Sequence, residues 1–188
     1  APLERVPGLG IGIPLNIFQL GFTSLYYNEN IITPDLVLLQ FMIGVFTYGS
    51  DRFFDSKIIN SNNIDIIKSL DTKKLNYYNY LQDNVYFVII CLSISYIYVY
   101  GILFNDILTL PIIPLLTSTI EYKKIKTIIG PYKPVYVSTL WMTGSLILPS
   151  ILHSHDYSIF ADYKVCLSFF SLMFAFTNFQ DIKDIEED

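Results

Sequence analysis

The sequence predicts an all-α protein, a single membrane domain over residues 1–188 that forms a polytopic transmembrane helical bundle of about six spans. Hydrophobic residues make up 52% of the chain and charged residues 15%, against roughly 25% charged residues in an average soluble domain. The mean hydropathy is +0.44. Between Asn84 and Ile120 the only charged residue is Asp106, and none lies between Pro134 and His155. Because a span needs about 20 mostly apolar residues, these two runs hold three spans.

Six apolar segments are long enough to be candidate spans. The first, "PGLGIGIPLNIFQLGFTSLYY", is the weakest because glycines, Pro14, Asn16 and Gln19 interrupt it. The third and fourth form a tight hairpin around "GILFND". Tyr and Phe gather near the span ends, as in the aromatic belts of membrane interfaces. The expected spans are about 7–27, 33–51, 84–103, 105–120, 134–153 and 159–180.

The loop 52–83 is longer than most connections without secondary structure. Its segment "SNNIDIIKSLDTKKLNYYNYL" carries apolar residues at near-helical spacing, among them Ile64, Ile67, Leu75 and Leu81. This spacing predicts that part of the loop is an interfacial helix that leads into the third span.

The basic residues indicate how the bundle is oriented. Six spans put the N-terminus, the loop 52–83, the segment "EYKKIKTIIGPYK" and the C-terminal acids on one side, which we name side A. Eleven of the 12 Lys and Arg residues fall on side A, and only Lys164 falls on the opposite side, side B. By the positive-inside rule, side A faces the cytosol, stroma or matrix.

Two groups of aspartates follow even-numbered spans on side A. Asp181, Asp184 and Asp188 stand at i, i+3 and i+7, so a helix would place them on one face. In "TYGSDRFFDSKIIN", Asp51 and Asp55 stand at i and i+4. Carboxylates in such proximity repel one another unless a cation lies between them, and Mg²⁺ favours one or two carboxylates plus phosphate oxygens.

A third side-A loop adds basic residues that suit phosphate oxygens: Tyr122 stands beside Lys123, Lys124 and Lys126. Acids for magnesium and lysines for phosphate on one surface suggest a lipid diphosphate whose tail lies in the bilayer. Simpler interpretations remain open. An acidic tail after a helix is often a solvated terminus, and lysines beside spans often serve only as topology determinants.

These motifs resemble those of the UbiA-type membrane prenyltransferases. "QDIKDIEED" is similar to the "KDIxDIEGD" form of the homogentisate prenyltransferase-like branch, and "DRFFDSKIIN" resembles the family's first Asp motif. "EYKKIK" occupies the place of the family's Tyr-and-Lys loop. The resemblance extends over about residues 36–188. In the first motif, Asp51 replaces the family's Asn, Asp55 matches its central Asp, and Ile59 stands in place of its last Asp.

The resemblance implies a helical bundle with a central cavity that opens to the bilayer. In the family, the Asp motifs hold Mg²⁺ and an isoprenoid diphosphate, whose ionisation gives an allylic cation that an aromatic acceptor attacks. The metal-diphosphate ligands here would be Asp51, Asp55, Asp181, Asp184 and Asp188, with Lys124 and Lys126 assisting at the phosphates. The family usually has nine spans, so we expect a UbiA-like bundle that lacks the last three.

Two functions follow from these expectations. The first is a non-catalytic accessory or structural subunit of a larger thylakoid or other organellar membrane complex, which Ile59 and the missing spans favour. The alternative is a Mg²⁺-dependent prenyltransferase acting on an isoprenoid diphosphate and an aromatic acceptor. The second motif suggests plastid relatives, with side A as stroma; the mitochondrial inner membrane is the other candidate location.

Two histidines in "LHSHD", His153 and His155, lie at the side-B end of the fifth span. Their alternate spacing suits a metal, or one imidazole suits the magnesium of a chlorophyll; the alternative is interfacial histidines hydrogen-bonded to water. As partners we expect membrane lipids, other membrane subunits, an isoprenoid lipid, and chlorophyll or carotenoid contacts. We expect no nucleic-acid partner.

Overall fold

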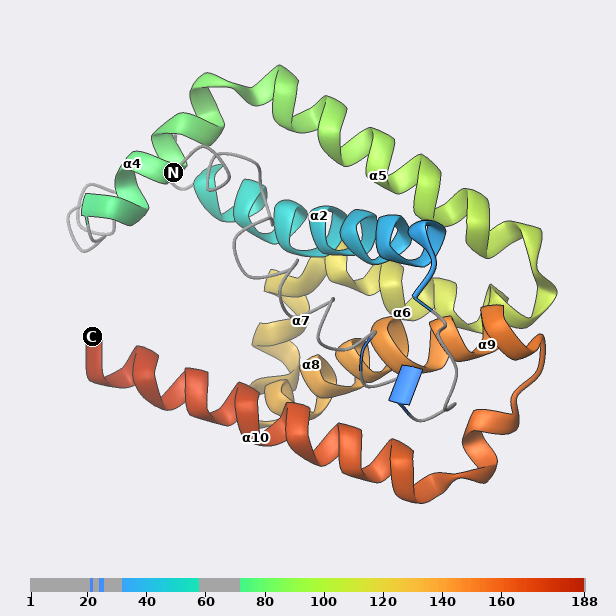
Figure 1. The fold of residues 1–188 in the computed structure, drawn as a ribbon. Helices are drawn as coiled ribbons and strands as arrows, with labels where there is room; N and C mark the ends of the chain where they lie inside the picture. Colours follow the sequence, from blue (N-terminus) through green and yellow to red (C-terminus); the bar gives the residue numbers. More distant parts are fainter. Residues whose placement is uncertain (1–20, 22–23, 26–31, 58–71, 188) are drawn as a thin grey trace.

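The computed structural model describes residues 21, 24–25, 32–57 and 72–187, and this part of the chain is helical without any strand (Figure 1). For residues 73, 123, 126 and 179–187 it describes the backbone alone. The predicted all-α fold is therefore confirmed over the described residues. Most of the expected span 7–27 lies outside them. The long helices are α2 (Pro34–Ser56), α4 (Thr72–Asp83), α5 (Val85–Asn105) and α10 (Tyr163–Glu187).

Between α5 and α10 the chain forms shorter helical segments, several of which begin with proline. Proline has no N–H to donate, so it suits the first turn of a helix and interrupts an interior. Pro114, Pro131, Pro134 and Pro149 each lie at such a start. The segments are η3 (Ile107–Ile112), α6 (Ile113–Ser118), η4 (Thr119–Glu121), α7 (Tyr122–Ile129), η5 (Gly130–Tyr132), α8 (Lys133–Met142), η6 (Thr143–Ile147), α9 (Leu148–Ser154) and η7 (Ser158–Ala161).

The helices form two packed groups that the shorter segments connect (Figure 1). In the first group α2 packs against α5 along its length and against α4 near its C-terminal end; in the second, α8 packs against α10. The two groups meet where α2 contacts η4 and η6. The main core lies at this junction, and its fully buried members include Leu39, Val99, Leu103, Leu116 and Leu148.

The two ends of the bundle carry different loops. The C-terminal ends of α2 and α10 lie at the same end as α4 and α7, which is the end we named side A (Figure 1). At the opposite end, the chain after α5 meets the chain after α9. There the Tyr157 hydroxyl donates to the carbonyl of Leu108 at 2.6 Å, and His155 Nδ1 lies 3.7 Å from Asp106 Oδ2. These contacts hold the side-B turns together.

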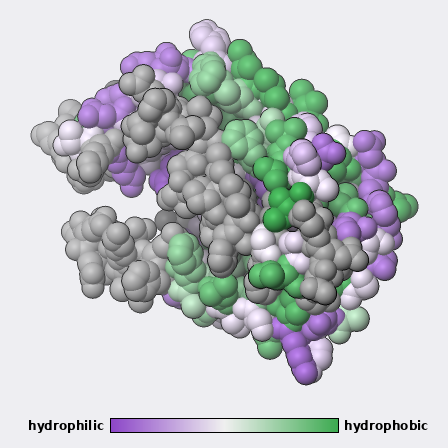
Figure 2. Space-filling model, in the orientation of Figure 1, coloured by the Kyte–Doolittle hydropathy of each residue, from purple (hydrophilic) through white to green (hydrophobic). Residues whose placement is uncertain are grey.

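Two described helical stretches, Val85–Asn105 and Thr127–Ser154, are long and apolar enough to cross a bilayer, and the apolar stretch Ile107–Glu121 is shorter. Much of α5 is exposed: Ile90, Ile97 and Phe104 are 56%, 69% and 65% exposed and follow one another at seven-residue spacing. A hydrophobic patch accordingly covers α5 in Figure 2. A core helix of a soluble protein would bury these side chains, so this face is suited to lipid.

Part of the loop predicted as an interfacial helix is helical, since α4 runs from Thr72 to Asp83; residues 58–71 lie outside the described part. One face of α4 is anchored on the C-terminal end of α2. Tyr78 and Leu81 are 2% and 0% exposed and form a cluster with Phe53 and Val88. The remaining surface of α4 is largely polar, and this packing fixes the helix beside the end of α2.

We predict that Leu81→Ala destabilises the protein by about 2–5 kcal/mol, because it removes a fully buried side chain and leaves a cavity between α4 and α2. The matched control is Leu167→Ala on α10, where the side chain is 60% exposed. Unfolding in mixed detergent micelles, followed by circular dichroism, measures both. Equal losses in the two variants would contradict the packing of α4 on α2.

Candidate functional site

A cavity of about 400 Å³ lies between α2 and the helical stretch formed by α8 and η6. Its size falls within the range of roughly 300–1,000 Å³ that is typical of small-molecule sites. The residues that α2 contributes recur every three or four positions, as one face of a helix requires. They are Gln40, Ile43, Gly44, Thr47, Tyr48, Asp51, Arg52 and Asp55.

The opposite wall of the cavity is also one face of a helix, and this helix runs antiparallel to α2. Lys133, Val137, Trp141 and Ser145 line the cavity from α8 and η6, at successive intervals of four residues. Because α8 begins at side A whereas α2 ends there, the two walls run antiparallel (Figure 1). Leu140 and Gly144 belong to the wall formed by α8 and η6, and other elements complete the lining with Lys74, Leu116, Thr119, Tyr122 and Thr177. The cavity thus has a side-A end and a deeper end.

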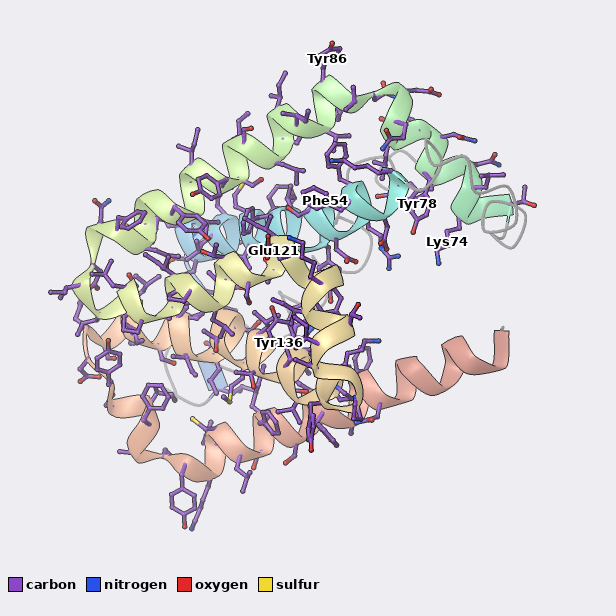
Figure 3. All side chains as sticks on the ribbon, turned by 180° about the vertical axis from the view of Figure 1, so that it is seen from behind. Phe54, Lys74, Tyr78, Tyr86, Glu121 and Tyr136 are labelled. Carbon is purple, nitrogen blue, oxygen red and sulfur yellow. The ribbon has the colours of Figure 1, made fainter. Side chains whose placement is uncertain are left out.

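The side-A end is lined by five charged side chains, and we name it the charged end: Asp51, Arg52, Asp55, Lys74 and Lys133. Burial lowers the pKa of Arg52, but Asp51, a hydrogen bond with Tyr78 and Asp55 together hold this pKa above its ordinary value. The guanidinium is therefore charged at every physiological pH. Figure 3 shows Lys74 and Tyr78 on the face of α4 that is turned toward α2.

The middle of the cavity is apolar and aromatic. The rings of Tyr48 on α2 and Trp141 on α8 have centroids 5.5 Å apart, and the Trp141 indole donates a hydrogen bond to the Tyr48 hydroxyl. Val137, Leu140 and Leu116 add aliphatic surface around this pair. A ligand that extends from the charged end into the cavity would meet these rings.

The deeper end is formed by Gln40, Gly144 and Ser145, and we name it the neutral end. Gln40 is 1% exposed, and its side-chain amide donates a hydrogen bond to the carbonyl of Gly144. Gly144 and Ser145 belong to η6, a π-helical turn of Thr143–Ile147. Pro149 explains this turn, because a proline ring clashes with the carbonyl four residues earlier, which is that of Ser145.

The predicted aspartates are distributed in the following way. Asp51 and Asp55 of the first motif both line the cavity. The backbone of α10 continues unbroken from Thr177, which lines the cavity, through positions 181 and 184. These positions stand at i+4 and i+7 from Thr177 and therefore share its face of the helix. The side chains of Asp181 and Asp184, and the whole of Asp188, lie outside the described part.

The predicted lysines lie elsewhere. Lys124 is exposed and its Nζ contacts Glu121 Oε1 at 2.9 Å, away from the cavity wall. The side chain of Lys126 lies outside the described part. The cations at the cavity are instead Arg52, Lys74 and Lys133, which none of the sequence motifs indicated as phosphate ligands. In principle the sequence could have indicated Lys133 as a cavity residue, because it precedes Trp141 by two helical turns and therefore lies on the same face of the helix.

The two predicted histidines lie at the side-B end of α9, remote from the charged end. His155 adopts a left-handed backbone conformation (φ 54°) after the last turn of α9 and pairs with Asp106. Within the described residues, no three His, Cys, Asp or Glu side chains form a cluster that could hold a metal ion. The structure thus brings His155 near Asp106, and it places both histidines at the end of the bundle opposite to the aspartate motif.

Comparisons of the chain with models of protein families, with curated proteins and with solved structures find no match.

We predict that the free energy of unfolding falls at alkaline pH because the Tyr78 phenol, which interacts with Asp55 and Arg52 of the charged end, loses its proton. Burial and the nearby Asp55 raise the pKa of the Tyr78 phenol above its ordinary value of 10.0. The unfolded chain therefore releases this proton first, so the stabilisation is complete below about pH 10 and is lost as the pH rises through the folded-state pKa.

Tyr78→Phe should consequently reduce the slope of unfolding free energy against pH above about pH 10. The control is Tyr86→Phe, whose side chain is 82% exposed. Chemical unfolding at a series of pH values measures both slopes. An unchanged slope in Tyr78→Phe would show that the phenol titrates as it does in the unfolded chain.

Proposed function

We propose that this chain is an integral membrane protein with a UbiA-like six-span bundle, and that its cavity binds an isoprenoid diphosphate. The observation that carries the proposal is the composition of the charged end. There the first-motif residues Asp51 and Asp55 lie on one cavity wall together with Arg52, while Lys74 and Lys133 approach from two other helices. The part of the cavity next to the charged end is apolar and aromatic, which suits a prenyl tail.

The charged end has the chemistry that a diphosphate requires. An arginine guanidinium presents a planar set of donors that matches two phosphate oxygens at once, and lysine ammonium groups act as mobile point charges. Tyr78 on α4 interacts with Arg52, so α4 and α2 both contribute to the surroundings of the guanidinium. Together these residues would hold the diphosphate at side A with the tail directed inward.

Asp51 and Asp55 fit a magnesium ion bound together with the diphosphate. They are two carboxylates one helical turn apart that line the same cavity, and Mg²⁺ typically takes one or two carboxylates, substrate phosphates and several waters. We propose that Asp181, Asp184 and Asp188 add ligands; the register of α10 with Thr177 supports this for Asp181 and Asp184. The ion would supply positive charge that offsets the charge of the diphosphate.

We predict that the double variant Asp51→Asn, Asp55→Asn weakens binding of geranylgeranyl diphosphate in the presence of Mg²⁺ by at least about tenfold. Mutation of a residue that only hydrogen-bonds to a metal ligand typically weakens metal binding by about tenfold or more, and loss of the ligands themselves should cost at least as much. The control is Asp35→Asn in the first turn of the same helix, where the side chain is exposed at the other end. Titration calorimetry in detergent measures the affinity. Failure of the wild-type chain to bind this ligand with Mg²⁺ would refute the proposal.

We further propose that the chain acts as a non-catalytic subunit of a larger thylakoid or other organellar membrane complex. The exposed apolar faces of α5 and α10 support this role, since Ile97 and Leu167 are 69% and 60% exposed. Lipids, partner helices, chlorophyll or carotenoid would cover these faces. Ile59 in place of the last aspartate of the first motif also favours binding without turnover.

The second candidate is a Mg²⁺-dependent aromatic prenyltransferase, which one specific feature favours. The Tyr48 and Trp141 rings lie in the cavity beyond the charged end, and aromatic faces stabilise nearby cations. In this reaction the bond between the prenyl carbon and the diphosphate oxygen breaks. The acceptor ring then bonds to the allylic cation and loses a proton.

We predict that the chain, solubilised gently from its own membrane, migrates in native mass spectrometry with a large complex. Geranylgeranyl diphosphate incubated with this complex, Mg²⁺ and homogentisate should remain intact, because we propose binding without turnover. Chromatography of the lipids detects any product. A free chain that releases diphosphate and forms a prenylated ring would instead establish the transferase.

A further inference from the structure

The segment that connects α6 and η4 to α8 lies across the bundle. It consists of α7 and η5, residues 122–132, and we name it the crosswise segment. In both ribbon views α2, α5 and α10 run in one general direction, whereas the axis of α7 is turned crosswise to them (Figures 1 and 3). Gly130, with a left-handed backbone (φ 49°), and Pro131 separate α7 from α8. In a bilayer that α5 crosses, α7 therefore lies close to the membrane plane.

The length of the helical stretch that follows places the crosswise segment at the membrane surface. The stretch Thr127–Ser154 has 28 residues, whereas a span needs about 20. Lys133 is its single Lys, Arg, Asp or Glu residue, and a charged side chain is costly within the hydrocarbon region. The span itself therefore begins after Lys133. The residues before it belong to the side-A interface.

Two large side chains of the crosswise segment are turned away from the protein. Ile128 is 83% exposed and Tyr132 is 70% exposed, whereas Ile125 and Ile129 of the same helix are partly buried. An interfacial helix inserts such apolar side chains into the boundary between headgroups and acyl chains. Tyrosine is enriched at this depth because its ring is apolar and its hydroxyl is polar. The exposed side of the segment is thus suited to the upper part of a lipid layer.

The crosswise segment also carries a surplus of positive charge. Between Thr119 and Lys133, Glu121 is the only acid, against the four lysines 123, 124, 126 and 133. Glu121 pairs with Lys124, but the two side chains are 61% and 73% exposed. Because an exposed ion pair contributes little free energy, Lys124 can exchange this partner for another anion. Lysines together with exposed apolar side chains favour binding to anionic lipids.

Aromatic packing holds the crosswise segment against the bundle. The rings of Tyr122 on α7 and Tyr136 on α8 stack, with centroids 6.0 Å apart and planes inclined by 13°. The Tyr136 hydroxyl shares a hydrogen bond with the hydroxyl of Ser118 on α6. Tyr122 and Lys133, which stand at the two ends of the segment, both line the cavity. A lipid headgroup held by the segment would therefore lie beside the charged end.

We propose that the crosswise segment is an interfacial anchor that binds the headgroups of anionic phospholipids at side A. The negative headgroups match the lysines at positions 123, 124 and 126, while Ile128 and Tyr132 enter the layer between the lipids. The inference rests on the membrane insertion of the proposed function and is independent of a diphosphate in the cavity. It gives Lys124, which lies away from the cavity wall, a ligand of its own.

Quenching of tryptophan fluorescence by brominated lipids measures which lipid lies beside a chosen residue. Trp141→Phe removes the single tryptophan of the chain, and Tyr132→Trp then supplies one reporter in η5. The full chain is reconstituted in vesicles of phosphatidylcholine and phosphatidylglycerol, with either lipid brominated close to its headgroup. We expect phosphatidylglycerol to be enriched beside this reporter about fivefold over its bulk share, the effect of roughly one lysine near an anionic surface.

The matched control is Tyr86→Trp in the same Trp141→Phe background. Tyr86 is 82% exposed at the side-A start of α5, where it points away from the bundle (Figure 3), and Asp83 lies three residues before it. We expect no enrichment of phosphatidylglycerol beside this reporter. Circular dichroism establishes that each variant is folded.

Replacing the three lysines of α7 together, with Lys123→Gln, Lys124→Gln and Lys126→Gln, should bring the enrichment at the Tyr132→Trp reporter to about one. About 1 M NaCl should also reduce it, because the screening length then falls to about 3 Å. Inorganic diphosphate, compared with sodium sulfate at equal ionic strength, should leave the enrichment unchanged. This comparison separates a lipid headgroup from a soluble phosphate as the ligand of the lysines.

Equal enrichment at both reporters would overturn the inference, and so would an enrichment that persists in the triple lysine variant. Loss of enrichment on adding inorganic diphosphate would overturn it as well, because the lysines would then serve a phosphate ligand. Quenching of the Tyr86→Trp reporter without quenching of the Tyr132→Trp reporter would refute this inference alone. Absence of quenching at both reporters would refute the proposed membrane insertion together with it.

Discussion

The geometry of this protein depends on the hydrogen bond that Gln40 donates to the carbonyl of Gly144. This bond joins α2 to η6 at the place where the two packed groups of helices meet. Toward side A, the cavity lies between α2 and α8. In a low-dielectric interior such a bond is stronger than in water and costly to break. It therefore sets the register between two antiparallel helices. That register places Lys133 on the same cavity as Asp51 and Asp55, and Trp141 beside Tyr48.

Polar and apolar side chains are distributed in a way that suits a bilayer. α5 directs Ile90, Ile97 and Phe104 outward, while charged side chains from α2, α4 and α8 line an interior cavity. In water the outward face would be a large apolar patch of the kind that monomeric soluble proteins avoid. In lipid the same face carries no penalty, and the polar groups are the ones that must be enclosed. A ligand with a charged head and an apolar tail fits both requirements of the cavity.

The sequence predicted those features that depend on one helix at a time. The apolar runs located α5 and most of α2, and the spacing of Asp51 and Asp55 predicted that they share a face. Features that depend on which helices face each other were not predictable. Lys74 and Lys133 reach the cavity through the packing of α4 and α8, whereas Lys124 pairs locally with Glu121. Periodicity within a segment carries no information about the register between two segments that lie about 100 residues apart.

The charge balance of the charged end indicates how its ligands would affect one another. Three cations, Arg52, Lys74 and Lys133, and two carboxylates, Asp51 and Asp55, leave one positive charge among the described side chains. A diphosphate alone would be attracted to the cations but repelled by the carboxylates. A metal ion alone would be attracted to the carboxylates but repelled by the cations. Each ligand thus removes the repulsion that the other meets. Because such coupling is reciprocal, the proposed magnesium ion would raise the affinity for diphosphate by the same factor as diphosphate would raise the affinity for magnesium.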